Sequence, residues 1–382
     1  MANSYQIEIG DSITFDTSEI QSLNAVNAVD VVGAVLSADE CTPVVFCDDS
    51  EVLADIPRGT PVRIYINGEL SFVYYYIGHE RTGETTYRIK TTSGIGLLDD
   101  VDSVGGLWVY SDAYRVVDAI QSFIGGEIVD DNLYMIQGGI FDCQVEKAVG
   151  NQIITGHLPY ASARENLHWL IMAYGFSCTK SEDGQILFSY VRATLNPKEI
   201  SEDKTYINGS VVTTTPKTQV SVEEFTFISA DTDEEVILYD SAKQGSATGN
   251  VTVVFESPCH ALVADGLTIV ESNCNYAVVT GGGKLKGKKY TKVSKLVTRG
   301  NSSENIASLK GVEIINPLNS ANVADRLYSY YTEAQTVNVN FVLENEKCGR
   351  QYAFTDVYGA SRTGFALKMN LVPSGIVKAD AS

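Results

Sequence analysis

The chain has 382 residues, of which 44% are hydrophobic and 20% charged, as expected for a folded globular protein of two to four domains. Its formal charge of −20 disfavours binding to free nucleic acid or to anionic membranes. No apolar run approaches the roughly 18 residues of a membrane-spanning helix, and residues 1–12 lack the features of a secretion signal. We therefore expect a protein without a membrane anchor that folds in a cytoplasm.

Residues 1–105 predict a first β domain. Within residues 62–92, three runs rich in Tyr, Val and Ile are separated by Asn67-Gly68 and by a second turn around Gly83. Asn and Gly tolerate positive φ angles, so Asn67-Gly68 is typical of a tight hairpin. The three runs therefore predict an antiparallel meander.

A helical pattern replaces the β pattern after the first domain. In residues 111–125, apolar side chains recur with the period of an amphipathic helix. We expect Ser111 to cap its N-terminus, Asp112 to lie in its first turn and Gly125 to end it.

A second helix is predicted over residues 162–175. Ser162 and Glu165 have the spacing of a capping box, and Gly175 is a typical residue at a helix end. A strand, a turn and another strand follow. Residues 106–195 therefore predict a small α/β domain.

The remainder of the chain is again rich in β patterns. Candidate strands cover residues 219–228, 234–240, 250–256, 276–280 and 290–297, a final helix covers 320–335, and closing strands cover 336–344, 350–357 and 363–372. These elements predict a second β domain made of residues 196–245 and 301–382, with another β domain inserted at 246–300.

A glycine-rich stretch at residues 281–290 has nearly the spacing of a phosphate-binding loop. Gly282, Gly287 and Lys288 match the G-x-x-x-x-G-K pattern, but Lys289 stands where a hydroxyl would hold Mg²⁺. The residues that follow indicate a strand, whereas a phosphate loop leads into a helix. We therefore expect a glycine loop between two strands and no nucleotide site.

A basic cluster follows the glycines in this otherwise acidic chain. Its members are Lys284, Lys286, Lys288, Lys289, Lys292, Lys295 and Arg299. Two interpretations remain open: a contact with an acidic partner, or a solvated strand edge protected by lysines.

No pattern in the sequence predicts a catalytic, cofactor or metal site. The seven cysteines show no C-x-x-C spacing and the four histidines are scattered, which indicates buried reduced thiols rather than a zinc site. No G-x-S-x-G motif or calcium loop occurs either. We expect a protein that is not an enzyme.

Four stretches, in this order, resemble the phage tail hub proteins. The first, 87–120, carries "GLLDD" and a double glycine before a helix, and the second, 154–188, carries "GHLP" and the Arg-Glu helix. The third, 251–290, ends in the glycine-rich stretch, and the fourth, 318–354, holds the last helix and "EKCGRQYAF". The resemblance is to baseplate hubs of contractile tails and to the N-terminal hub region of tail-associated proteins, above all those from prophages of Gram-positive bacteria.

The resemblance implies an α+β, mainly β fold, with two tail-tube-like β-barrels and inserted small α/β and β domains. It implies a homotrimeric ring that adapts a six-fold tail tube to a three-fold spike or fibre at the tail tip of the virion. The implied partners are a tail tube or distal tail protein, a spike or tail fibre protein, and a tape-measure protein. It implies no cofactor and no specific nucleic acid.

Two other functions remain as alternatives. One is a tail-associated cell-wall hydrolase. The other is a carbohydrate-binding tail adhesin, because some of the 21 tyrosines could stack on sugars. If a trimer encloses a channel, we expect its wall to be acidic or neutral and the basic cluster to lie outside it, since a cationic wall would retain phosphates.

Overall fold

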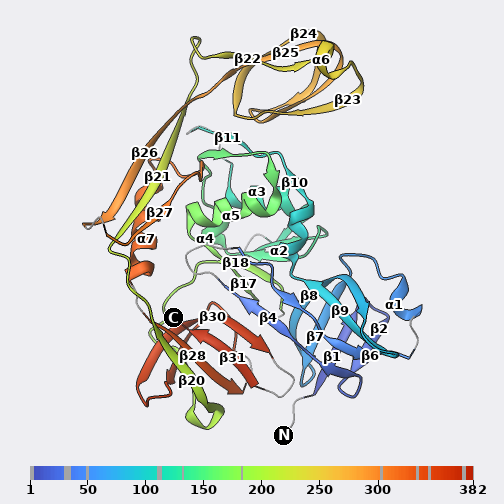
Figure 1. Cartoon of the computed structure of the whole chain (residues 1–382), viewed down its shortest axis with the longest axis vertical. Coiled ribbons are helices and arrows are strands. Elements are labelled where there is room, and N and C mark those ends of the chain that lie inside the picture. Colours follow the sequence, from blue (N-terminus) through green and yellow to red (C-terminus); the bar gives the residue numbers. More distant parts are fainter. Residues whose placement is uncertain are drawn as a thin grey trace.

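The computed structural model describes most of the chain, and it has the α+β, mainly β fold that was predicted (Figure 1). The described residues are 4–29, 36–48, 51–109, 114–130, 133–181, 184–301, 304–332, 335–342, 346–371 and 376–381. Two β units lie side by side at one end, a helical part lies in the middle, and a further β sheet lies at the other end.

The first β unit is built around the predicted meander. Its elements are β1 (Tyr5–Ile9), β2 (Ile13–Asp16), β3 (Ile20–Ser22), β4 (Ala25–Ala28), β5 (Glu40–Cys41), β6 (Val44–Phe46), α1 (Glu51–Ala54), β7 (Pro61–Ile66), β8 (Glu69–Arg81) and β9 (Thr86–Thr92). Asn67 and Gly68 have φ angles of 54° and 82°, which confirms the tight hairpin between β7 and β8. Val62, Ile64 and Ile66 alternate along β7 and face the core.

The second β unit contains strands that lie far apart in the sequence. They are β19 (Lys198–Ile200), β20 (Thr205–Thr213), β28 (Gln335–Val342), β29 (Gln351–Thr355), β30 (Ser361–Leu371) and β31 (Ile376–Ala381), with a short 3₁₀ turn at Glu202–Lys204. Side chains from both units pack into one shared core, in which Leu23 and Tyr74 lie together with Phe341 and Phe354.

The two units form one continuous sheet. β4 pairs antiparallel with β30, with Ala25 opposite Leu371 and Ala28 opposite Lys368. The resulting sheet has 15 strands, and none of the sheets in the described residues closes on itself. The two barrels predicted from the resemblance are therefore open units in the described residues, and the β4–β30 pairing joins them.

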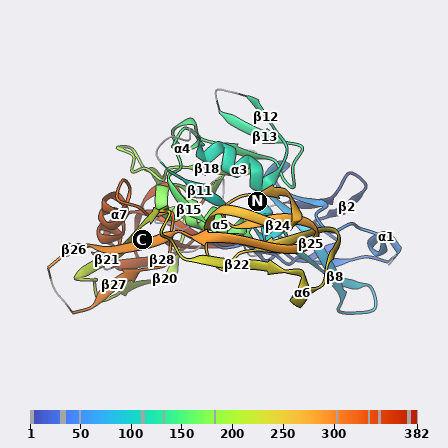
Figure 2. The same cartoon turned by 90° about the horizontal axis from the view of Figure 1, so that it is seen from above.

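The middle part packs helices against a small mixed sheet. Its elements are α2 (Gly94–Leu97), β10 (Asp102–Ser103), β11 (Gly106–Trp108), α3 (Val116–Ile124), β12 (Glu127–Asp130), β13 (Tyr134–Gln137), β14 (Cys143–Val145), α4 (Lys147–Gly150), β15 (Gly156–Leu158), β16 (Ala161–Ser162), α5 (Ala163–Tyr174), β17 (Ser177–Lys180) and β18 (Ile186–Ser189), with a 3₁₀ turn at Leu98–Asp100. The five-stranded sheet has the order β12-β13-β14-β18-β17. The hairpin of β12 and β13 projects from one side of the molecule (Figure 2).

The helix predicted at 162–175 is confirmed. The hydroxyl of Ser162 accepts a hydrogen bond from the backbone N–H of Glu165 at 3.2 Å, and Gly175 ends α5 with a φ of 74°. The other helix predicted for this part, α3, starts later than predicted.

α3 is capped at Arg115, whose backbone N–H donates to the carboxylate of Asp118 at 2.9 Å. The acidic side chain in the first turn therefore takes the place of the predicted cap. The predicted residues Ser111 and Asp112 lie outside the described residues.

The outer part consists of an arm and a sheet. The arm is a three-stranded sheet in the order β26-β21-β27, made of β21 (Gln219–Ile228), β26 (Thr291–Gly300) and β27 (Ile306–Leu309). It packs against α7 (Ser320–Thr332), the predicted last helix. The outer sheet contains β22 (Glu235–Asp240), β23 (Ala247–Val254), β24 (Cys259–Ser272) and β25 (Tyr276–Lys289), with α6 (Ser241–Gln244) beside it.

In Figure 1 the arm connects α7 with the outer sheet. The domain limits that were inferred from the sequence stay a prediction. Among the described residues, no helix combines the length and apolar character that crossing a membrane requires.

The expected glycine loop between two strands is wrong, because the glycines lie inside β25. Gly281 and Gly283 have φ angles of 92° and 148°, and the register with β24 shifts between Asp265 and Leu267. A Cβ atom at Gly283 would lie 2.0 Å from the backbone oxygen of Asp265. The glycines thus bend one long strand against its neighbour, and no helix follows them as a phosphate loop requires.

We expect Gly283→Ala to lower the free energy of unfolding by about 2 kcal/mol or more, because both its φ angle and the space around it exclude a methyl group. Gly249→Ala, in β23 with no atom within 4 Å of the added Cβ, is the matched control and should change stability little. Urea denaturation of both variants tests this. Equal effects would contradict the role given to Gly283.

We expect Tyr74→Phe to lower the free energy of unfolding by about 1–3 kcal/mol. The fully buried hydroxyl of Tyr74 donates to the backbone oxygen of Val26 in β4 at 2.9 Å, and its loss leaves that oxygen without this donor. Tyr65→Phe removes a half-buried hydroxyl that donates to Glu8 and should cost less. Denaturant midpoints of the two variants measure the difference.

Candidate functional site

The basic cluster is divided between two different sheets. Lys284, Lys286, Lys288 and Lys289 lie on β25, which has neighbouring strands on both sides in the outer sheet. Lys292, Lys295 and Arg299 lie on β26, which is an edge strand of the arm among the described residues.

The lysines on β25 are held by an acidic segment of the same chain. Lys284 pairs with Asp240 at 3.6 Å, Lys286 with Glu235 at 3.0 Å and Lys289 with Glu234 at 3.4 Å, while Nζ of Lys288 donates to the backbone oxygen of Asp231 at 2.6 Å. The carboxylates of Glu234, Glu235 and Asp240 thus serve as internal counter-charges. Most of these side chains are partly exposed, so each pair contributes only modestly to stability.

The basic residues on β26 also face carboxylates of this chain. Lys292 pairs with Glu313 at 2.9 Å, and Nη2 of Arg299 lies 3.2 Å from Oδ2 of Asp325 on α7. Lys295 lies opposite Glu224 in the β21–β26 ladder.

These contacts weaken the case for the basic cluster as a binding surface. Much of its positive charge is already compensated within the chain, so it offers a partner less charge than the sequence suggests. The three residues on β26 fit the other interpretation, an edge strand carrying basic side chains. A role for the cluster in contacting a partner stays a prediction.

A large groove lies where the two β units meet the middle part. Its volume is about 820 Å³, and it is lined by the start of β8, the hairpin of β17 and β18, the segment 190–198 and the loop at 346–352. Its charged side chains are Glu69, Lys180, Arg192, Lys198, Glu346, Lys347 and Arg350. Basic groups therefore outnumber acidic ones in this groove, against the trend of the whole chain.

Several charged side chains of the groove pair with neighbouring groups of the chain. Lys198 pairs with the buried Glu346 at 2.6 Å, and Nζ of Lys347 donates to the backbone oxygen of Ser181 at 2.6 Å. Arg192 pairs with Glu146 at 2.8 Å. Sequence reasoning did not find this groove, because four distant segments build it and none has a motif of its own.

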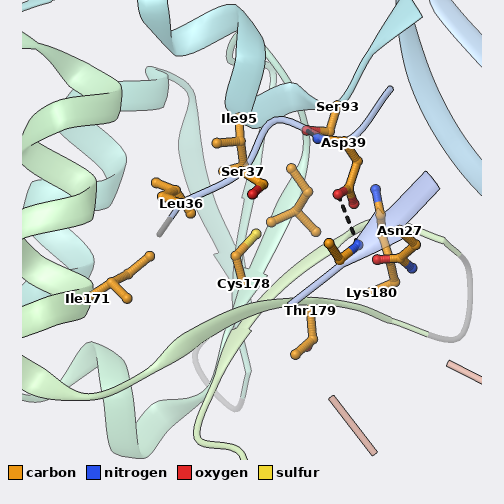
Figure 3. A pocket seen from close by; sticks show the side chains of 12 residues that line it. Asn27, Leu36, Ser37, Asp39, Ser93, Ile95, Ile171, Cys178, Thr179 and Lys180 are labelled. Carbon is orange, nitrogen blue, oxygen red and sulfur yellow. Dashed lines mark hydrogen bonds between the residues drawn. The ribbon is translucent and has the colours of Figure 1, made fainter. Parts of the chain in front are cut away.

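A small cavity lies beside the groove, between β4 and the middle part (Figure 3). Its volume of about 30 Å³ is enough for about one water molecule. The carboxyl of Asp39 and the side chains of Cys178 and Lys180 surround it. Asp39 accepts a hydrogen bond from the backbone N–H of Ala28 at 3.0 Å.

Burial raises the pKa of Asp39 to about 6, although Lys180 and the Ala28 hydrogen bond act in the opposite direction. Desolvation penalises the carboxylate more than its neighbours stabilise it. The carboxyl therefore changes its protonation state near pH 6. Sequence reasoning missed Asp39, since a single Asp in a β-rich segment has no signature.

The described residues contain no group of three His, Cys, Asp or Glu side chains that could hold a metal ion. None of the seven cysteines, all of which lie in the described residues, is in a disulfide bond. Burial raises the pKa of Cys178 and of Cys274 to about 12, which keeps both thiols protonated and poorly nucleophilic. The described part of the chain therefore presents surfaces and grooves, and we assign no catalytic group in it.

We expect the stability of the Asp39→Asn variant, relative to that of wild type, to increase as pH rises. Between the ordinary pKa of 3.8 and about 6, folded wild-type protein binds more protons than unfolded protein, so its stability falls as pH increases. From about pH 4.5 to pH 8, the variant should gain about 2 kcal/mol relative to wild type. Asp265→Asn, at an exposed carboxyl, is the control, and denaturation at both pH values is the measurement. A difference independent of pH would contradict the assignment.

Comparison with known proteins reveals a shared fold. No family model and no curated protein matches the chain. A tail protein from Neisseria meningitidis is similar in structure over 100% of this chain and 96% of its own, with a TM-score of 0.56 and 9% identity. A 43 kDa tail protein of prophage MuSo2 from Shewanella oneidensis is similar over 99% and 98%, with a TM-score of 0.55 and 11% identity. Over its full length, the chain thus shares the fold of these two tail proteins.

Proposed function

We propose that the chain is a structural component of a phage tail and forms the hub at its tip. The likeness to two tail proteins along the whole of each chain supports this proposal most strongly. An inserted enzyme domain would leave a large part of one chain without a counterpart, and at least 96% of both compared chains is covered.

The proposed hub is a homotrimeric ring. Each chain carries two β units that are fixed side by side by the β4–β30 pairing, so three chains place six units in a ring. Such a ring matches a six-fold tube on one face, while the middle and outer parts keep three-fold symmetry for a spike or fibre.

The open ends of the large sheet support a head-to-tail ring. In the described residues, β2 lies at one end of the sheet and β20 at the other, each with a neighbour on one side only. Unpaired strand edges favour pairing with another chain, and a repeated contact between two different surfaces closes a ring when the rotation fits. We propose that the β2 end of one copy meets the β20 end of the next.

The proposed partners are a tail tube or distal tail protein, a spike or tail fibre protein, and a tape-measure protein. We propose the tail tip of the virion as the location. A net charge of −20 suits a channel wall that does not retain DNA, with the paired basic cluster away from the channel.

We expect three copies of the chain at the tip of a reconstructed tail particle. Val212, an exposed residue of β20, should matter for assembly, because a charge there opposes contact with the next copy. Val212→Glu should reduce the fraction of complete tails at least several-fold, whereas Leu318→Glu, at another exposed residue, should not. Electron microscopy of particles and thermal unfolding of the purified variants separate assembly from folding.

Six or twelve copies at the tip would contradict the trimer. Release of muropeptides from cell walls by the purified chain would instead favour the hydrolase, and saturable binding of glycans by monomers would favour the adhesin.

A further inference from the structure

The turn between β24 and β25 is anchored on the middle part by side-chain amides. Nδ2 of Asn275 donates to the backbone oxygens of Val104 and Leu158, both at 2.8 Å. Nδ2 of Asn273 donates to the backbone oxygen of Gly105 at 3.3 Å. The tip of the outer hairpin is therefore held by carbonyl groups of two middle segments.

These contacts fix the orientation of the Asn275 amide. A carbonyl oxygen can only accept, so the group that faces Val104 and Leu158 must be the NH₂ group. The amide oxygen then lies 2.7 Å from Nε2 of His157. Because that oxygen is an acceptor, Nε2 must carry a hydrogen.

The other ring nitrogen of His157 faces a carboxylate. Nδ1 lies 2.6 Å from Oε2 of Glu313, while Oε1 of Glu313 accepts a hydrogen bond from Lys292 at 2.9 Å. Burial raises the pKa of Glu313, but the hydrogen bonds and charges of His157 and Lys292 outweigh it and lower the pKa overall. The carboxylate is thus ionised and accepts a hydrogen from Nδ1 as well.

We propose that His157 is a buried imidazolium that fastens the outer sheet to the middle part in a pH-dependent way. Both of its nitrogens donate, which only the charged ring can do. The side chain is 4% exposed, so its two short hydrogen bonds replace water. This inference is independent of the role proposed for the chain in a tail.

Among the groups around His157, the carboxylate of Glu313 supplies the negative charge that compensates the charged ring. From β21 the ring of Phe227 packs against it, with centroids 5.2 Å apart, and Glu313 and Lys292 are the charged groups that the network brings to it. The thiol of Cys274 contacts the Asn275 oxygen, and burial raises its pKa to about 12, so it stays neutral. The charged network thus joins β15, the outer turn, the Glu313 segment and β26.

Loss of one proton from the ring breaks one of the two contacts. A neutral ring presents a lone pair either to the Asn275 oxygen or to the Glu313 carboxylate, and two acceptors repel each other. The junction therefore holds while both ring nitrogens carry a hydrogen and loosens when one of these hydrogens is lost. Loss of this contact weakens the attachment of the outer sheet to the middle part.

The first test is the protonation state of the ring in the whole chain. With ¹⁵N-labelled histidine, both ring nitrogens of His157 should have the chemical shifts of protonated nitrogens at neutral pH, with the signal assigned by its loss in His157→Gln. A neutral tautomer at neutral pH would overturn the proposal.

The second test is hydrogen exchange at the outer turn. After correction for intrinsic rates, protection of residues 273–276 should fall about tenfold or more between pH 7 and pH 10, because hydrogen bonds to charged groups are worth more than neutral ones. In Glu313→Gln the amide NH₂ can donate to a neutral Nδ1 and its oxygen can accept from Lys292, so the fall should disappear. The hairpin of β17 and β18 is the internal control, and an equal fall in wild type and Glu313→Gln would contradict the mechanism.

Discussion

The pairing of β4 with β30 is the contact on which the rest of this architecture depends. It joins strands from the two ends of the chain, and near it the thiol of Cys348 donates to the backbone oxygen of Asn27, 321 positions away. Once this contact forms, the middle and outer parts become insertions that leave a shared sheet and return to it. The entropy cost of closing such long insertions rises only slowly with their length. A rigid two-unit base can thus carry large additional parts.

Many basic side chains of this protein pair with nearby carboxylates, and the charge left over is negative. The lysines of β25 lie against the acidic segment that leads into β22, and Arg299 of β26 lies against Asp325 of α7. Each pair is weak in water, yet together they leave few strong positive fields on the outer sheet. The excess of acidic residues therefore gives the remaining surface a negative charge, which favours solubility and repels DNA.

The junctions between parts rely on buried polar groups rather than on apolar contacts alone. Asp39 lies where the first unit meets the middle part, and His157 lies where the middle part meets the outer turn. A buried polar group requires its partners, so it specifies one orientation where apolar surfaces tolerate several. The same burial makes the Asp39 junction respond to pH, because it raises the pKa of that carboxyl to about 6.

The sequence by itself determined the local elements of this protein, because turn chemistry and periodicity act over a few residues. Asn67-Gly68, the Ser162 cap and Gly175 were each recognised from neighbours in the chain, as was the mainly β class. The bend at Gly283, the open sheet, the groove and the partners of Asp39 and His157 were decided by tertiary structure alone. Each depends on atoms from distant segments, such as the oxygen of Asp265 against Gly283, and no local pattern encodes which segments meet.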